Sequence, residues 1–281
     1  EVAEFWGTLL SGVEKAAEEY GVELKVLTSP REIDIDKQIE LIRQVTADKP
    51  DVMILSAADY DRCAEATEEA IAAGIGVVAI DTDVNAAGRA CFVGSNSYEI
   101  GLEMGRAMAS YLPEGGKVAV IQHMLTTTTG IERTRGVLDA LNEAGNIEIL
   151  GSFCCDNSTE QAQTITTELL SADPEIRGFV CTNEVCNVGA ANALVELGMG
   201  GRVYVVGCDN SQRQIQFLEQ NIIQAIVTQR PFNMGYVAVQ QAVRVANGEQ
   251  TDDFVEVSCV LITRENMYTQ ENQKLLFPVL R

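Results

Sequence analysis

Two aspartates that directly follow apolar runs are the residues of this chain best placed to do chemistry. Asp81 follows the run 77–80, and Asp209 follows Cys208 after the run 203–207. In open parallel α/β sheets, ligands bind beyond the carboxyl ends of the strands, so a carboxylate there more often meets a ligand than serves packing. A turn or a helix N-cap is the structural alternative for each aspartate, because Asp is well suited to βα junctions.

Amides stand at two further strand ends. Asn183 follows the run 178–182, and Gln229 follows the run 222–228. Together with the two aspartates they supply donors and acceptors that suit a neutral, hydroxyl-rich molecule. Because these four positions are spread along the chain, we predict a single cleft that is lined from two lobes.

The elements that must position these side chains follow from the hydrophobic periodicity. Strand-like runs alternate with amphipathic helical patterns, which predicts repeated βα units and parallel sheets with helices on both faces. Strands are expected at 22–28, 51–55, 76–80, 117–121, 147–153, 177–182, 203–207 and 222–228, with a short strand at 90–93 and an alternating strand at 254–262. Helices are expected at 4–20, 34–47, 60–73, 97–111, 131–144, 158–171, 184–197, 211–220 and 232–246. The fold class is therefore α/β, with two doubly wound parallel-sheet lobes.

The boundary between the lobes is expected near residue 95, where the βα alternation restarts after Gly94. No linker-like Pro/Ser stretch separates the halves, which favours lobes joined by short crossing strands. The chain opens directly in the helix at 4–20, whereas an α/β chain of this kind is expected to open with a strand. We therefore expect the first strand to be absent from this sequence.

Composition argues against several classes of protein. The chain has 41 acidic and 20 basic residues, a formal net charge of -21 and no run of Lys or Arg, so no nucleic-acid partner is expected. It contains no apolar window of about 18 residues, so no membrane span is expected. The 8 cysteines include no CxxC pair and His123 is the single histidine, so neither a metal site nor a cofactor is expected. Buried free thiols are favoured over disulfides, and a structural role is favoured for His123.

Six short motifs occur in a fixed order along nearly the whole chain. They are Phe5-Trp6, Ile80-Asp81, Glu132-Arg133, Thr182-Asn183-Glu184, Val206-Gly207-Cys208-Asp209 and Thr228-Gln229-Arg230-Pro231. In this order and at this spacing, the set resembles the type I periplasmic binding proteins. Within them it is similar to the ribose/galactose-binding group, which delivers monosaccharides to ABC importers.

The resemblance implies two lobes joined by a three-segment hinge that closes around a sugar. The crossings are expected near 94–96, 229–230 and 258–259. The expected lobes are an N-terminal lobe of residues 1–95 plus 230–258 and a C-terminal lobe of residues 96–229 plus 259–281.

The resemblance also implies a set of ligand-binding residues. Phe5 and Trp6 are expected to stack on the sugar ring, and Asp81 to accept hydrogen bonds from its hydroxyls. The residues expected to bind from the other lobe or the hinge are Arg133, Asn183, Asp209 and Gln229, together with Asn157 at a position where relatives place a contacting residue. This set suits a sugar, whose hydroxyl edges need donors and acceptors and whose C–H face needs an aromatic plate.

The implied function is that of an extracytoplasmic solute-binding protein, located in the periplasm or at the cell surface as a lipoprotein. Its expected partners are a monosaccharide or similar polyol and the permease of an ABC importer, and the protein is expected to be a monomer. No bond is made or broken in this function, so the chain is not expected to be an enzyme. The alternative is a ligand-sensing domain of a receptor or of a lactose-repressor-type regulator that uses the same cleft.

Three departures from the family pattern bear on the ligand. Thr82 stands where ribose binders place an Arg beside the aspartate, and this removes a bidentate donor. Ala3 and Glu4 replace an expected Asn-Pro, and Cys208 replaces a common aromatic residue. The sequence therefore supports a general sugar site better than it supports ribose or any other named sugar. Paired carboxylates at Asp81 and Asp209 would also suit a glycoside hydrolase, but no catalytic motif accompanies them.

Overall fold

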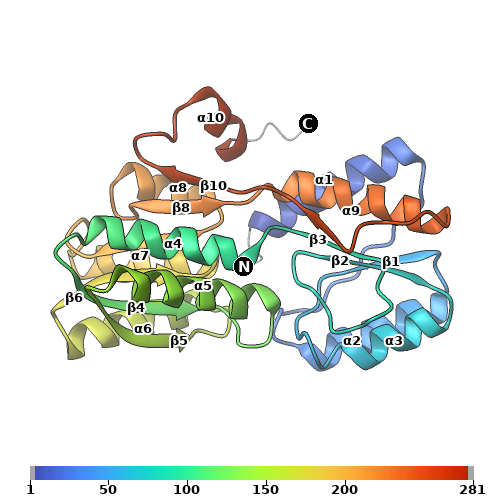
Figure 1. The fold of residues 1–281 in the computed structure, drawn as a ribbon, viewed down its shortest axis with the longest axis horizontal. Coiled ribbons are helices and arrows are strands. Elements are labelled where there is room, and N and C mark those ends of the chain that lie inside the picture. The colour runs from blue at the N-terminus through green and yellow to red at the C-terminus, as the bar shows by residue number, and fades with distance from the viewer. Residues whose placement is uncertain (1–3, 278–281) are drawn as a thin grey trace.

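The apolar runs form two separate β-sheets, each with helices on both faces, and these make up two lobes (Figure 1). The computed structural model describes residues 4–277. The sheet of the first lobe is wholly parallel, in the order β1 (Val52–Leu55), β2 (Gly76–Ile80), β3 (Cys91–Gly94) and β9 (Phe254–Glu256). Helices α1 (Glu4–Tyr20) and α9 (Pro231–Ala246) pack on one face of it, and α2 (Ile35–Asp48) and α3 (Ala64–Ala72) cover the other.

The second lobe contains a six-stranded sheet. Its order is β10 (Val260–Thr263), β8 (Ala225–Thr228), β7 (Tyr204–Cys208), β6 (Ile176–Cys181), β4 (Gly116–Gln122) and β5 (Ile147–Cys154). All neighbours are parallel except β10, which runs antiparallel to β8. The flanking helices are α4 (Ser97–Tyr111) and α5 (Thr128–Ala144) on one face and α6 (Thr159–Ala172), α7 (Glu184–Glu196) and α8 (Gln212–Glu219) on the other, with α10 (Gln270–Leu276) near the end of the chain.

Three crossings connect the lobes, so the expected three-segment hinge is confirmed. They join β3 to α4, β8 to α9, and β9 to β10. Two of them lie side by side, because Val257 N donates to Gly94 O (2.8 Å) and Ser95 Oγ donates to Val257 O (2.8 Å). The alternating run expected as one strand at 254–262 is therefore two strands, since its middle residues leave one sheet and enter the other.

The expected strand at 22–28 is wrong. These residues form no strand, and within residues 4–277 no neighbouring strand forms a ladder with them. Alternating apolar and polar residues alone cannot make a strand, because the backbone N–H and C=O groups of a strand need hydrogen-bond partners on a neighbouring strand. The apolar side chains of Val22, Leu24 and Val26 are left exposed.

Two of the expected helices begin at a different residue from the one predicted. The helix expected from residue 60 begins at Ala64, because Asp59 holds a turn by accepting hydrogen bonds from the backbone N–H groups of Asp61 and Arg62. The helix expected from residue 131 begins at Thr128, because Thr127 acts as its N-cap and accepts a hydrogen bond from Gly130 N (3.1 Å).

Close packing of α4 against α5 fixes the position of the helix that carries Arg133. A Cβ added at Gly101 would lie 2.2 Å from Arg133 O, and one added at Gly136 would lie 2.2 Å from Tyr98 O. Glycine at both crossing points therefore allows the two helix backbones to touch.

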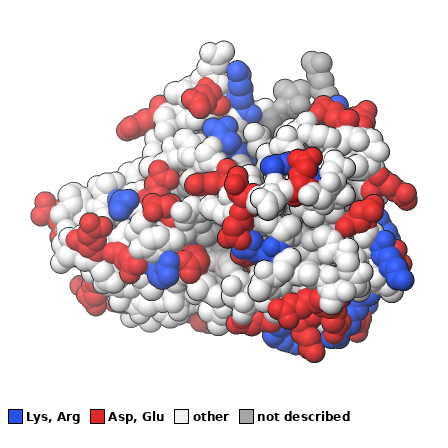
Figure 2. Space-filling view, turned by 45° about the vertical axis from the view of Figure 1, so that its right-hand side comes forward, with Lys and Arg blue, Asp and Glu red and all other residues white. Residues whose placement is uncertain are grey.

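Charge on the surface follows the acidic composition. Figure 2 shows acidic side chains scattered over the visible face, with fewer basic side chains among them. Such a field favours solubility and disfavours polyanionic partners. No helix within residues 4–277 is long and apolar enough to cross a membrane.

Candidate functional site

The two strand-end aspartates have the same local structure in the two lobes. Asp81 follows β2 with φ 61°, and Asp209 follows β7 with φ 71°. Each backbone N–H donates to the neighbouring strand, Asp81 N to Val93 O and Asp209 N to Val227 O, both at 2.9 Å. The backbone therefore turns sharply after each of the two strands, and the hydrogen bond to the neighbouring strand is kept at the turn. Asp tolerates this left-handed conformation better than most residues.

Arg133 is buried between the lobes and is not a solvated helix residue. Its side chain is 3% exposed, and Nη1 donates to Thr182 O at 2.9 Å and lies 4.0 Å from Asp209 Oδ2. Its Nε has no hydrogen-bond partner within the described part of the chain. A buried guanidinium nitrogen without a partner is available to an acceptor from outside the protein.

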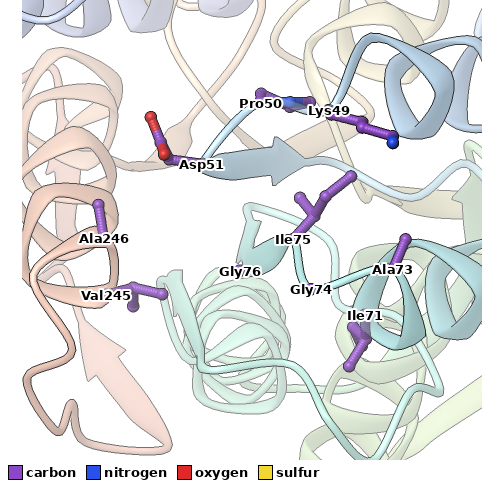
Figure 3. A pocket seen from close by; sticks show the side chains of 10 residues that line it. All are labelled: Lys49, Pro50, Asp51, Ile71, Ala73, Gly74, Ile75, Gly76, Val245 and Ala246. Carbon is purple, nitrogen blue, oxygen red and sulfur yellow. The ribbon is translucent and has the colours of Figure 1, made fainter.

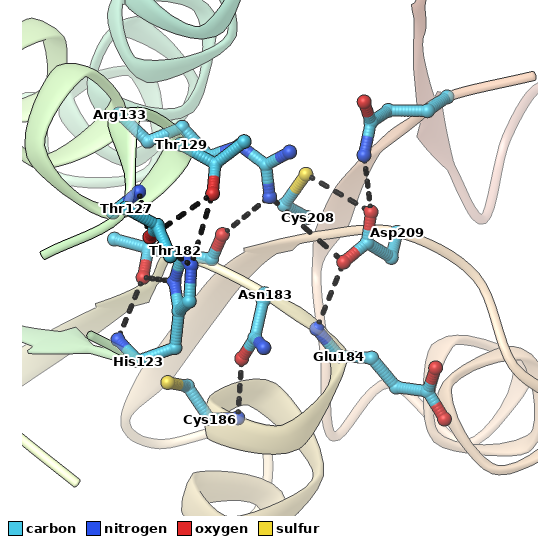
Figure 4. Close-up of polar contacts among 12 residues, drawn as sticks. His123, Thr127, Thr129, Arg133, Thr182, Asn183, Glu184, Cys186, Cys208 and Asp209 are labelled. Carbon is cyan, nitrogen blue, oxygen red and sulfur yellow. Dashed lines mark hydrogen bonds and ion pairs between the residues drawn. The ribbon is translucent and has the colours of Figure 1, made fainter. Parts of the chain in front are cut away.

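Asp209 is the centre of a polar cluster (Figure 4). Its Oδ1 accepts from Gln229 Nε2 (2.7 Å), and its Oδ2 accepts from Glu184 N (3.1 Å) at the first turn of α7. Gln229 is 2% exposed. The expected strand-end residues Asp209 and Gln229 are thus brought together, with Arg133 beside them.

Asn183 and Asn157 form a chain of amides at the amino end of α7. Asn183 is the N-cap of this helix and accepts a hydrogen bond from Cys186 N (3.0 Å). Its Nδ2 donates to Asn157 Oδ1 (2.8 Å), and Asn157 Nδ2 donates to Glu32 Oε2 (2.7 Å). The two amides therefore reach from the second lobe to a carboxylate of the first.

Phe5 and Trp6 lie differently from one another. Phe5 is buried in the apolar core of the first lobe with Leu9 and Val13. Trp6 is half-buried and edge-on to Phe5, with ring centroids 5.2 Å apart, and its Nε1 donates to Glu32 Oε1. Of the two rings, that of Trp6 is linked through Glu32 to Asn157 of the second lobe.

Glu32 is the site residue that the sequence reasoning missed. It lies in the loop between the extended segment 22–28 and α2, and it joins Trp6 of its own lobe to Asn157 of the other. The available signal was its place in a loop that precedes a helix, but the expected strand ended four residues earlier, at residue 28. The pattern of polar residues at strand ends therefore does not include Glu32.

Burial dominates the electrostatics of the cleft. It raises the pKa of Asp81 to about 7; the Arg133 charge opposes this effect, and the charges of Asp209 and Glu32 add to it. Burial likewise raises the pKa of Glu32, which the Trp6 hydrogen bond opposes and the Asp209 charge reinforces. Burial and the nearby Asp209 charge raise the pKa of Glu184 to about 7.

His123 is neutral in this setting. Burial, aided by the Arg133 charge, lowers its pKa to about 3. Its ring nitrogens contact Thr182 Oγ1 (2.7 Å) and Thr129 Oγ1 (3.2 Å), so both sides of the imidazole are occupied by hydroxyls (Figure 4). The geometry fits a structural histidine.

Direct contacts close the cleft at its rim. Thr126 Oγ1 of the second lobe donates to Ala58 O of the first (2.8 Å), and Thr126 O accepts from Tyr60 N (2.9 Å). Asp83 N donates to Thr128 Oγ1 (3.0 Å). The structure is therefore that of a closed two-lobed protein.

Another hollow lies at the opposite edge of the first sheet (Figure 3). Its lining includes Lys49, Asp51, Ile75, Gly76 and Val245, at the amino ends of β1 and β2. Ligands of open α/β sheets bind at the carboxyl ends, and this lining has no convergent set of polar side chains. The cleft is the better candidate. Within residues 4–277, no group of three or more His, Cys, Asp or Glu side chains is placed to hold a metal ion.

Two α/β lobes on a three-segment hinge, with polar side chains of both lobes meeting between them, define a ligand-binding protein of the hinge-closing class. The chain belongs to the family described as periplasmic binding protein domain, whose family model matches residues 2–250.

Individual relatives are consistent with this family. The D-allose-binding periplasmic protein of Escherichia coli (strain K12) is 24% identical over 274 residues, which are 92% of this chain and 88% of that protein. A sugar transporter from Clostridium phytofermentans superposes with a TM-score of 0.87 at 30% identity, covering 93% of this chain and 94% of that chain. A solute-binding protein from Agrobacterium radiobacter, solved in complex with D-arabinose, superposes with a TM-score of 0.94 at 24% identity, covering 98% and 95% of the two chains. These relatives are binding proteins and transport components.

Proposed function

We propose that this protein captures a monosaccharide or similar polyol between its lobes by hinge closure and delivers it to an ABC importer. One observation carries the proposal: polar side chains of both lobes meet between the lobes, beyond the carboxyl ends of both sheets. A relative named for D-allose and a structural neighbour solved in complex with D-arabinose support a monosaccharide as the ligand class.

The proposed roles follow from the hydrogen-bonding capacity that each side chain has left. Asp81 accepts from ligand hydroxyls, because its buried carboxylate has no hydrogen-bond partner among the described residues. Arg133 donates through its unpartnered Nε. Trp6 presents its ring, with Phe5 behind it, to the apolar face of the ligand. Asn157, Asn183, Asp209 and Gln229 complete the wall of the second lobe and the hinge.

The proposed division of the chain assigns the elements to two moving bodies. The first consists of residues 1–95 plus 230–258 and the second of residues 96–229 plus 259–281, of which residues 1–3 and 278–281 lie outside the described part of the structure. The packing of α9 against α1 supports the placement of the segment after residue 230 in the first body.

The proposed setting is extracytoplasmic, in the periplasm or as a cell-surface lipoprotein, with the permease of the importer as partner. We propose a monomer that binds no nucleic acid and carries out no catalysis. The net charge of -21 supports the exclusion of polyanionic partners.

The test is calorimetric titration of the purified protein with a panel of pentoses, hexoses and polyols, after a thermal-shift screen. A ligand present at about 100 times its dissociation constant should stabilise the folded protein by roughly 2.7 kcal/mol. We expect Asp81→Asn to lose this stabilisation and Glu14→Gln, on the exposed face of α1, to keep it. A well-folded protein that binds none of the panel would rule out the proposal.

A further inference from the structure

The closed cleft contains more negative than positive charge. Asp81 is 7% exposed, Asp209 is 6% exposed and Glu32 is half-buried, and the charges of Glu32 and Asp209 both raise the pKa of Asp81. Within residues 4–277, Arg133 is the one cationic side chain whose charge reaches Asp81. Glu184 adds a further acidic group beside Asp209.

The other nearby cations are committed elsewhere. Arg89 contacts Asp83 (2.7 Å) and Asp253 (2.9 Å), and Arg230 lies 3.7 Å from Glu271. His123 is neutral because its pKa is lowered to about 3. Thr82, directly after Asp81, adds no charge, and its Oγ1 donates to Ala57 O (2.7 Å).

Among the carboxylates of Glu32, Asp81 and Asp209, that of Asp81 differs in its hydrogen bonds to the described residues. Both oxygens of Asp209 accept hydrogen bonds, from Gln229 and from Glu184 N, and both oxygens of Glu32 accept, from Trp6 and Asn157. The Asp81 side chain is 7% exposed and accepts none from the described residues. A buried carboxylate without a partner is strongly unfavourable unless a cation or a proton compensates it.

Resting on the proposed function, we propose that the ligand carries a protonated amine in addition to its hydroxyls. An aminated monosaccharide or amino polyol would place its ammonium group on Asp81, with Glu32 and Asp209 supplying the surrounding negative field. A metal ion is a poor alternative, because no metal-binding group of three side chains occurs in the described residues. Three donors on an ammonium suit a carboxylate that accepts no hydrogen bond from the described residues.

The experiment compares matched ligands by calorimetric titration at pH 7. Three sets pair D-glucose, D-galactose or D-mannose with its 2-amino analogue and with the N-acetylated analogue, which keeps a substituent but removes the charge. A fourth pair is sorbitol and 1-amino-1-deoxysorbitol. We expect at least one amine to bind ten-fold or more tightly than its neutral partners.

Variants locate the source of the preference. Asp81→Asn should abolish the preference for the amine, Glu32→Gln should reduce it, and Glu14→Gln should leave it unchanged. Neutral sugars that bind as well as or better than the amines would overturn this inference and leave the proposed function standing. Binding of none of the compounds would overturn both. An amine preference that survives Asp81→Asn and Glu32→Gln would show that these carboxylates do not bind the charge.

Discussion

The Asp81 carboxylate is expected to lower the stability of the ligand-free protein. Its pKa in the folded state is raised to about 7 by burial, from 3.8. A raised carboxyl pKa means that the folded state binds the proton more tightly, so the stabilisation is present at low pH and is lost as pH rises through about 7. The charged groups that face Asp81 are Arg133, Asp209 and Glu32, and the latter two reinforce the effect.

Replacing this carboxylate should therefore stabilise the protein as pH rises. At pH 8, Asp81→Asn should unfold at a higher urea concentration than the parent, because its free energy of unfolding should be higher by a few kcal/mol. At pH 5 the difference in free energy should be smaller. Urea denaturation followed by circular dichroism at the two pH values measures this. A stability difference of equal size at both pH values would contradict the raised pKa of Asp81. The control variant Glu14→Gln should have the same stability as the parent at both pH values.

Arg133 should contribute to stability as well as to binding. Arg133→Ala leaves Asp209 without its charged neighbour and Thr182 O without its donor, so the free energy of unfolding should fall by about 3–5 kcal/mol. The control is Arg135→Ala on the same helix, whose side chain is 57% exposed, and which should change stability by about 0–1 kcal/mol. Chemical denaturation of both variants provides the comparison, and equal losses would contradict a buried role for Arg133.

One rule of parallel sheets covers four of the proposed site residues, and the sequence could therefore predict them. Asn183, Asp209 and Gln229 follow strands of the second sheet and Asp81 follows a strand of the first, and parallel topology brings such strand ends to one edge of each sheet. Glu32 does not follow a strand, and its importance arises from contacts with Trp6 and Asn157 that depend on the closed lobes. Local sequence carries no signal for a contact of that kind.

At the scale of elements, α7 depends on a cap that also faces the cleft. Asn183→Ala removes the acceptor for Cys186 N and should lower the free energy of unfolding by about 1 kcal/mol. It should also weaken ligand binding, because the contact with Asn157 is lost.

A second cap separates these two effects. Ser158 is the N-cap of α6 and accepts a hydrogen bond from Gln161 N (3.2 Å). Ser158→Ala should lose a similar amount of stability and keep its affinity for ligand. Denaturation combined with titration compares the two variants, and equal affinities would show that Asn183 acts only as a cap.

The sequence predicted strands well where an apolar run also has neighbouring strands to pair with. The strands at 76–80 and 203–207 are buried, apolar and flanked by pairing neighbours. The run at 22–28 has the same alternation but no partner, and the run at 254–262 passes from one sheet to the other. Pairing depends on the whole fold, so periodicity could not separate these cases.

At the scale of the whole molecule, the cross-lobe contacts set the balance between open and closed forms. Thr126→Ala removes the hydrogen bond to Ala58 O, which is worth about 0.5–1.5 kcal/mol and exists only in the closed form. Affinity for ligand should therefore fall by roughly 2- to 10-fold, although we assign Thr126 no ligand contact. Titration measures the affinity, and small-angle scattering should show a larger radius of gyration without ligand than with it. An unchanged affinity would mean that this contact does not stabilise closure.

The left-handed backbone at Asp81 and Asp209 limits which side chains can stand at the base of the cleft. Asn and Gly fit this conformation, whereas β-branched and bulky residues are strained there. Directed evolution of a biosensor from this protein would therefore find few acceptable substitutions at the two positions. Glu32 has no such backbone restriction, so a library randomised at position 32 is the more productive route to a new ligand.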